Sequence, residues 1–431
     1  AVLYALPGTQ LKHAFSAVTG LCLVQWIFGP DWIHSFVTAV ITYLLCLVLP
    51  RKSVGTVAFY FVMAYMTGSH MYRMYISYMS GTFDFTGTQM VLTMKLTSFA
   101  YNLGDGGDKM VLQETPHEGK MAKVYADRAR FAVRTMPSPL AYLGYVYCFT
   151  CILAGPAFEY KDYERAIDGD AYKTKDGSAR KPPTLFAGLL RLLVAVLCLG
   201  GHLQTFIDTV PYFARYAILM VAMFSDRLKF YFAWKIAEGA SILGGFGFEG
   251  YTDEGKVKGW KGVENIDIRG FETATCVQSI SKVWNKRTQG WLERYTYHRS
   301  GRSLTATYFV SAIWHGLYPG FFIMFMTIPL MTNVERLLKS KINPLVVPGF
   351  DGYDLKTYPA GVVGWLYWGV CWLCTMAFMN YVVQVFSMGS LENSLTALSG
   401  HWFLPHLVLL VAYVLLEVMP ATKKVAKDKK A

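Results

Sequence analysis

The residues of this sequence most suited to chemistry are a histidine and an asparagine in two adjoining segments. His315 is the only side chain titrating near neutral pH in the uncharged run 303–331, SLTATYFVSAIWHGLYPGFFIMFMTIPLM, and Asn285 lies in 279–299, SISKVWNKRTQGWLERYTYHR. An imidazole in apolar surroundings stays neutral more readily, because desolvation disfavours its charged form, and a neutral imidazole is a competent general base. A carboxamide can hydrogen-bond the imidazole or the reacting groups without titrating. Together they suit proton abstraction from a hydroxyl that attacks an activated acyl group.

The position of His315 within its apolar run adds a second argument. At about 1.5 Å of rise per helical residue, His315 would lie about 17 Å along a helix that starts near Leu304, close to the middle of a hydrocarbon layer roughly 30 Å thick. An ionisable side chain at that depth is costly unless it faces protein or a cavity. Position alone leaves two interpretations open, a functional histidine and a purely structural one.

Basic side chains surround Asn285 and are opposed within the segment by Glu293 alone. They are Lys282, Lys286, Arg287, Arg294, Arg299 and Arg302. Such a cluster could grip the phosphates of coenzyme A at a membrane face. The alternative is ordinary anchoring on the cytosolic side of a membrane, where Lys and Arg are enriched.

Composition places these segments in a membrane protein. Of 431 residues, 53% are hydrophobic and 16% are charged, against a typical charged share of about 25%. Many uncharged runs reach the roughly 18 residues needed to span a bilayer as a helix. The net charge of +12 is spread over short Lys- and Arg-containing stretches between apolar runs, as in cytoplasmic loops, so we expect a lipid bilayer rather than nucleic acid as the partner.

The hydropathy pattern predicts an all-α multi-pass fold. Ten apolar runs could span or enter the membrane: 14–28, 32–49, 54–79, 140–158, 185–203, 212–225, 230–245, 303–331, 360–387 and 401–418. Two further segments, 86–103 and 272–299, are amphipathic, and we expect each to line a polar interior or to lie along the membrane interface. The hydrophilic connections are too short for a separate globular domain, so a single membrane domain, 1–431, is predicted.

Other chemistries find little support. Cys148 and Cys151, like Cys371 and Cys374, fall inside apolar runs without further ligands nearby, so they are interpreted as packing residues, and neither a metal nor a permanent cofactor is expected. Neither a G-x-S-x-G nor an H-E-x-x-H motif occurs. Two other classes stay open: a lipid-binding or scrambling scaffold, and a transporter or channel using charged residues near apolar runs. The candidates for such a path are His70, Arg73, Lys95, Arg191, His202, Asp208 and Arg215.

The two chemical segments resemble the membrane-bound O-acyltransferase family. The family's hallmark, an intramembrane histidine with an upstream asparagine or aspartate, matches His315 in SAIWHG and Asn285 in VWNKRTQGWL. Segments 86–106, TGTQMVLTMKLTSFAYNLGDG, and 142–163, YLGYVYCFTCILAGPAFEYKDY, look like blocks of the lysophospholipid acyltransferase branch, closest to its fungal broad-specificity members. The F-Y-x-D-W-W-N block of the sterol and diacylglycerol branch is missing, since SISKVWN stands in its place.

This resemblance implies a fold, an activity and a set of site residues. About 10–12 membrane-embedded helices would enclose a catalytic chamber, in which a fatty acyl group passes from the cosubstrate acyl-CoA to a lysophospholipid hydroxyl, usually at sn-2. His315 would be the base and Asn285 its orienting or polarising partner, while Trp284 and Trp314 would shape the chamber. Substrate binding is assigned to those two tryptophans and to Lys282, Lys286, Arg287 and Arg294.

The C-terminal sequence suggests a location. The tail KKVAKDKKA places Lys427 and Lys429 at the fifth and third positions from its end, which resembles a dilysine retrieval signal of the endoplasmic reticulum. Such a signal requires a cytosolic C-terminus, which the positive charge favours. The alternative is plain anchoring to anionic lipid.

Overall fold

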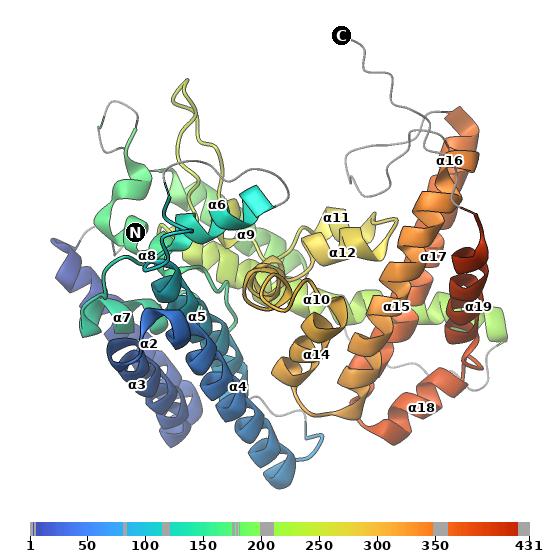
Figure 1. The fold of residues 1–431 in the computed structure, drawn as a ribbon, viewed down its shortest axis with the longest axis horizontal. Coiled ribbons are helices and arrows are strands. Elements are labelled where there is room, and N and C mark those ends of the chain that lie inside the picture. Colours follow the sequence, from blue (N-terminus) through green and yellow to red (C-terminus); the bar gives the residue numbers. More distant parts are fainter. Residues whose placement is uncertain are drawn as a thin grey trace. The chain divides into compact units, whose positions relative to one another are not determined.

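The structure is a computed structural model that describes residues 3, 6–80, 84–113, 121–174, 177, 180, 182–198, 211–347 and 361–420. Throughout these residues the chain is helical or irregular apart from isolated bridge residues, among them the antiparallel pair Tyr251 and Val257 (Figure 1). The predicted all-α fold is therefore confirmed.

The chain divides into two compact units that alternate along the sequence. The first comprises Ala1–Gly201, Arg227–Ile266 and Asn285–Leu317, and the second comprises His202–Asp226, Asp267–Trp284 and Tyr318–Ala431. Asn285 and His315 thus belong to the same unit. The single domain 1–431 stays a prediction.

The first unit is built around a buried helix. Its helices are α2 (Thr9–Phe28), α3 (Trp32–Val48), α4 (Arg51–Ile76), α5 (Phe85–Asp105), α6 (Ala122–Phe131), α7 (Pro139–Val146), α8 (Tyr160–Asp168), α9 (Thr184–Leu197), α13 (Lys286–Leu292) and α14 (Leu304–His315), with short turns at Gly29–Asp31, Asp170–Tyr172, Lys261–Val263 and Glu293–Tyr297. The last of these is π-helical. The helix α10 (Tyr212–Leu243) contributes its second half to this unit. Helices α3 and α4 pack along α5, and α2 packs on α7 (Figure 1).

The helix α5 is buried on almost every side although it carries polar groups. It starts at Asp84, whose carboxylate accepts a 2.9 Å hydrogen bond from the Thr86 amide, as expected of an N-cap. Lys95, fully buried inside it, donates to the backbone carbonyls of Tyr145 and Val146. Segment 86–103 therefore lines the protein interior, and the alternative of a helix lying along the membrane interface is wrong.

A close approach of backbones joins α2 to the aromatic core. A Cβ atom added at Gly20 would lie 1.7 Å from the carbonyl oxygen of Tyr147, so only glycine fits there. One helical turn earlier, the Ser16 hydroxyl donates to the Gly144 carbonyl over 2.8 Å. Small side chains thereby let α2 and α7 touch, which is common between membrane helices.

The second unit combines long apolar helices with several short ones. It contains α11 (Ile268–Glu272), α12 (Val277–Val283), α15 (Pro319–Lys341), α16 (Asn343–Val346), α17 (Gly361–Met388), α18 (Leu391–Ser399) and α19 (Leu404–Val418), together with the first half of α10. Within it, α15 packs against both α17 and α19 (Figure 1).

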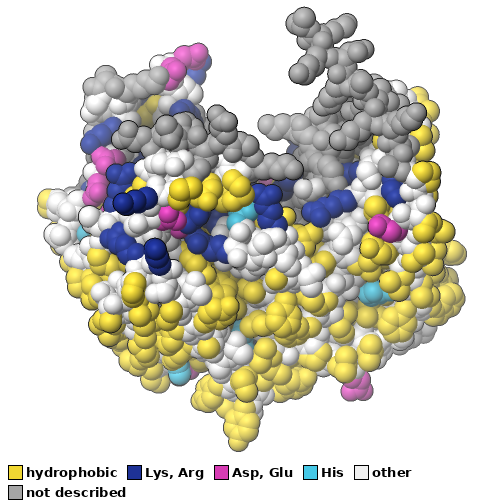
Figure 2. Space-filling model, viewed as in Figure 1, with side chains coloured by type: hydrophobic (Ala, Val, Ile, Leu, Met, Phe, Trp, Pro, Cys, Tyr) yellow, Lys and Arg dark blue, Asp and Glu magenta, His cyan; other side chains and the backbone are white. Residues whose placement is uncertain are grey.

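Fewer helices than expected have the length and composition of a membrane span. In the described residues these are Thr9–Val48, which comprises α2 and α3, Pro319–Val346 and Gly361–Met388; α18 and α19, bent by 76°, would make a fourth if they form one span. Several of the ten predicted runs instead form shorter or more polar helices, because hydropathy does not separate an interior helix from one that faces lipid. The protein is a multi-pass membrane protein. On the visible face of the first unit, at the left of Figure 2, hydrophobic side chains cover the lower surface and Lys and Arg gather above them.

Candidate active site

The helix α14 places His315 at its very end. It starts after Ser303, whose hydroxyl oxygen accepts a 3.2 Å hydrogen bond from the Ala306 amide. It stops at His315 because Gly316 adopts φ 139° and ψ 176°, a backbone conformation open almost only to glycine. The start near Leu304 is as predicted, and the apolar run 303–331 forms two helices, α14 and α15, rather than one.

The backbone of α14 fixes the tautomer of His315. Its Nδ1 lies 2.7 Å from the carbonyl oxygen of Ser311, one helical turn earlier. A carbonyl oxygen only accepts hydrogen bonds, so Nδ1 carries the hydrogen and the lone pair of the neutral ring is on Nε2. The ring is partly buried and stands edge-on to Trp314, with 4.6 Å between centroids. His315 thus has the tautomer that a general base acting through Nε2 requires.

Asn285 occupies the joint between two short helices. It has φ 42° and ψ 54°, a left-handed conformation that asparagine tolerates better than most residues, and it immediately precedes α13. Its side-chain oxygen accepts a 2.9 Å hydrogen bond from the Thr288 hydroxyl. In this orientation the NH₂ group is the donor end of the carboxamide, the end that a developing negative charge would need.

One face of α5 supports both segments. The sulfur of Met94 lies 3.3 Å from the Thr288 hydroxyl, and the indole of Trp291 in α13 donates to the Thr97 hydroxyl over 2.9 Å. On the same face, the carbonyl of Met90 accepts from the indole of Trp314 over 3.0 Å. Positions 90, 94 and 97 follow helical spacing and therefore share one side of α5.

Two aromatic rings complete the support of the segments that carry the predicted site residues. Trp291 and Trp314 lie 6.0 Å apart and belong to one core cluster with Met63 and Met94. The two predicted site residues are thus carried by helices that rest on a common base. Trp314, at 4% exposure, is part of this base.

The predicted phosphate-binding residues already have protein partners. The ammonium of Lys286 pairs with Glu264, and Arg287 donates to the Lys261 carbonyl over 2.6 Å. Arg294 pairs with Glu159 at 2.6 Å. The expectation that Glu293 alone opposes the cluster holds only along the sequence, because Glu159 and Glu264 approach from other segments. Phosphate binding by Lys286, Arg287 and Arg294 stays a prediction.

The other two predicted substrate-binding residues lie in the second unit. Trp284 packs on Phe271, with 5.0 Å between ring centroids, and Lys282 is exposed on α12. Their roles stay predictions.

A buried polar cluster escaped the sequence reasoning. Glu159, 4% exposed, accepts hydrogen bonds from Asn102 at 2.8 Å, Arg294 at 2.6 Å and Tyr295 at 3.1 Å. Burial lowers the pKa of Arg294, but Glu159 and Tyr295 raise it, and the guanidinium pKa ends above its ordinary value. The cluster fixes the π-helical turn that continues α13. The only sequence signal was that Asn102 and Glu159 lie in the two blocks that resemble the acyltransferase family.

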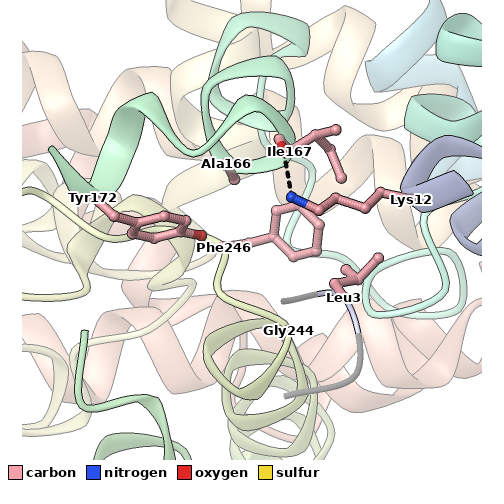
Figure 3. A pocket seen from close by; sticks show the side chains of 7 residues that line it. All are labelled: Leu3, Lys12, Ala166, Ile167, Tyr172, Gly244 and Phe246. Carbon is pink, nitrogen blue, oxygen red and sulfur yellow. Dashed lines mark hydrogen bonds between the residues drawn. The ribbon is translucent and has the colours of Figure 1, made fainter. Parts of the chain in front are cut away.

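One small pocket in the described part of the chain lies apart from the predicted site residues. The pocket is small, includes Leu3, Lys12, Ile167 and Phe246 in its lining, and contains none of the predicted site residues (Figure 3). Its Lys12 ammonium donates to the Ile167 carbonyl over 2.9 Å.

Two of the residues suggested for a transport path have partners within the protein. Arg73 pairs with Asp84 at 2.8 Å, and Arg215 donates to the Gly400 carbonyl over 2.7 Å. His202 and Asp208 lie outside the described residues. Among described residues no group of three His, Cys, Asp or Glu is arranged to hold a metal ion.

Comparison with known proteins identifies the family of the chain. A family model described as MBOAT, membrane-bound O-acyltransferase family, matches residues 71–384. Membrane-bound glycerophospholipid O-acyltransferase 2 of Homo sapiens is 30% identical over 439 residues, which cover 96% of this chain and 80% of that protein. Lysophospholipid acyltransferase 1 of Arabidopsis thaliana is 29% identical over 451 residues, covering 99% and 92% respectively.

Fold and family match define a helical membrane acyltransferase. The chain belongs to the membrane-bound O-acyltransferase family, and the resemblance read from His315 and Asn285 is confirmed. It is an acyltransferase.

Proposed function

We propose that the protein transfers a fatty acyl group from acyl-CoA to the free hydroxyl of a lysophospholipid, usually at sn-2. The similarity to proteins named as glycerophospholipid and lysophospholipid acyltransferases supports this substrate class. The single observation that carries the mechanism is the hydrogen bond from Nδ1 of His315 to the Ser311 carbonyl, which leaves the lone pair on Nε2.

His315 acts first as base and then as acid. Its Nε2 takes the proton of the lysophospholipid hydroxyl while the oxygen attacks the thioester carbonyl carbon of acyl-CoA, forming a tetrahedral intermediate. The carbon–sulfur bond then breaks, and the imidazolium returns the proton to the departing thiolate of coenzyme A. The products are a diacyl phospholipid and free coenzyme A, and the enzyme needs no permanent cofactor.

Asn285 serves as the polar partner of this reaction. Thr288 holds its carboxamide oxygen, so its NH₂ group is suited to hydrogen-bond the developing oxyanion. Trp284 and Trp314 would shape the apolar surroundings, and Lys282, Lys286, Arg287 and Arg294 would attract the phosphates of coenzyme A. We place the enzyme in the endoplasmic reticulum membrane with a cytosolic C-terminus; Lys427 and Lys429, the basis for this, lie outside the described residues.

The decisive experiment is coenzyme A release by purified protein given oleoyl-CoA and a panel of lysophospholipids. His315→Ala should lower turnover by at least about 100-fold, the scale of a lost general base. His34→Ala is the matched control, because His34 is also a partly buried histidine, bonded at 2.8 Å to the Tyr65 hydroxyl. Near-wild-type turnover of a folded His315→Ala variant would overturn the mechanism. Solute flux across sealed vesicles without coenzyme A release would instead support a transporter.

A further inference from the structure

A second buried histidine contacts the backbone next to His315. His70 of α4 is 6% exposed, and its Nε2 lies 3.1 Å from the carbonyl oxygen of Trp314, the residue before His315. Since that carbonyl can only accept, Nε2 of His70 is the donor. His70 and Trp314 are far apart in sequence and belong to the same compact unit.

This contact satisfies a group that a helix end leaves unpaired. The last four carbonyls of an α-helix have no intrahelical partner, and α14 ends at His315. The amide of Gly316 donates a 3.1 Å hydrogen bond to the Ala312 carbonyl. The imidazole of His70 donates to the Trp314 carbonyl. His70 therefore caps the end of α14 from a neighbouring helix.

The cap acts where the helix is least constrained by its own hydrogen bonds. Immediately after His315 the backbone turns through Gly316 into a conformation that breaks the helix. The Trp314 indole donates to the Met90 carbonyl, and the His315 imidazole donates to the Ser311 carbonyl. The Trp314 carbonyl, in turn, accepts its hydrogen bond from His70. Removing the last of these would free the peptide that carries the base.

We propose that His70 is a positioning residue for His315, acting through the Trp314 carbonyl without touching the substrate. The proposal rests on the proposed function, in which His315 is the base. Misplacing a catalytic group by about 1 Å lowers turnover by about 100-fold while leaving ground-state binding largely intact. The expected signature is a fall in kcat at nearly constant KM.

Three substitutions separate this role from simple packing. Gln places an amide nitrogen about where Nε2 of histidine lies, Asn places one nearer Nδ1, and Leu has no donor. His70→Gln should keep kcat within about threefold of the wild type, whereas His70→Asn and His70→Leu should lower it about 10- to 100-fold, with KM for both substrates within about twofold.

A matched control tests for a general effect of removing a buried histidine. His13, 7% exposed in the same unit, is bonded at 3.0 Å to the Tyr163 hydroxyl and lies outside the catalytic segments. His13→Leu should change stability but not kcat per folded molecule. The proposal is overturned if folded His70→Leu keeps more than half of wild-type kcat, or if His70→Gln and His70→Leu lose kcat equally.

Amide hydrogen exchange gives a readout independent of catalysis. His70→Leu should accelerate exchange in peptides covering 312–317 at least tenfold, and His70→Gln should not. Unchanged exchange in folded His70→Leu overturns the positioning role whatever the activity. If the wild-type protein released no coenzyme A, the proposed function would fail, and the exchange comparison would still decide whether His70 holds the end of α14.

Discussion

Removing Glu159 should destabilise the first unit and disorder the segment that carries Asn285. Its carboxylate is buried and receives three hydrogen bonds, including the ion pair with Arg294. Removing one partner of a buried pair typically costs about 3–5 kcal/mol, because the other charge is left uncompensated. The Arg294 side chain keeps 22% exposure, which lowers the expected loss in Glu159→Ala to about 3 kcal/mol.

Substituting Arg294, the ion-pair partner of Glu159, measures the coupling free energy between the two residues. Arg294→Met alone leaves Glu159 with hydrogen bonds from Asn102 and Tyr295, so its loss should be smaller, about 2 kcal/mol. The double variant lacks both charges, and its loss should fall below the sum of the single losses by about 2 kcal/mol. Such coupling reports the pair itself rather than damage to the surrounding fold.

The assay is unfolding in mixed micelles at increasing fractions of a denaturing detergent, followed by intrinsic tryptophan fluorescence. Trp291 lies two residues before the π-helical turn that Glu159 anchors and reports on this region. The reasoning is refuted if the losses of the two single variants add to within about 0.5 kcal/mol in the double variant, since independent sites behave in that way. An unchanged free energy of unfolding in the Glu159→Ala variant would refute the reasoning more directly.

Two further predictions test the packing and the partner of the base. Gly20→Ala should prevent recovery of folded protein, because the added Cβ would meet the Tyr147 carbonyl. The control Gly68→Ala in α4, with open space around its added Cβ, should leave stability unchanged or raise it by up to about 1 kcal/mol. Size-exclusion profiles and thermal unfolding measure both outcomes. Thr288→Val should lower kcat about tenfold with unchanged KM, since the Asn285 carboxamide loses its anchor, and Thr288→Ser should restore it. Equal kcat in Thr288→Val and wild type would contradict that role for Thr288.

The family could be recognised from His315 and Asn285 because their signal is local. An imidazole inside an uncharged run is costly and therefore informative, and Asn285 lies within a segment whose residues resemble a known block. The start of α14 near Leu304 followed from the same run. The end of α14 at His315 depends on the backbone conformation of Gly316. A glycine can either continue a helix or end it, so its presence in the sequence did not predict this end.

The partners of the charged residues could not be predicted, because they are brought together only by the fold. Lys286 and Arg294 meet Glu264 and Glu159 across loops and helices whose packing has no signature in the local sequence. The surroundings of a helix could not be read from its hydropathy for a related reason. A helix such as α5 is surrounded by protein, so an apolar or mixed pattern there reflects interior packing rather than contact with lipid.

The placement of the His315 imidazole therefore follows from the end of a helix as much as from depth in a membrane. Within α14, the Ser311 carbonyl orients the imidazole of His315, and the Trp314 carbonyl meets a donor from α4. Both acceptors are backbone groups, so neither can titrate or change rotamer. An imidazole held in this way keeps both its tautomer and its position, the two properties that the proposed general base requires.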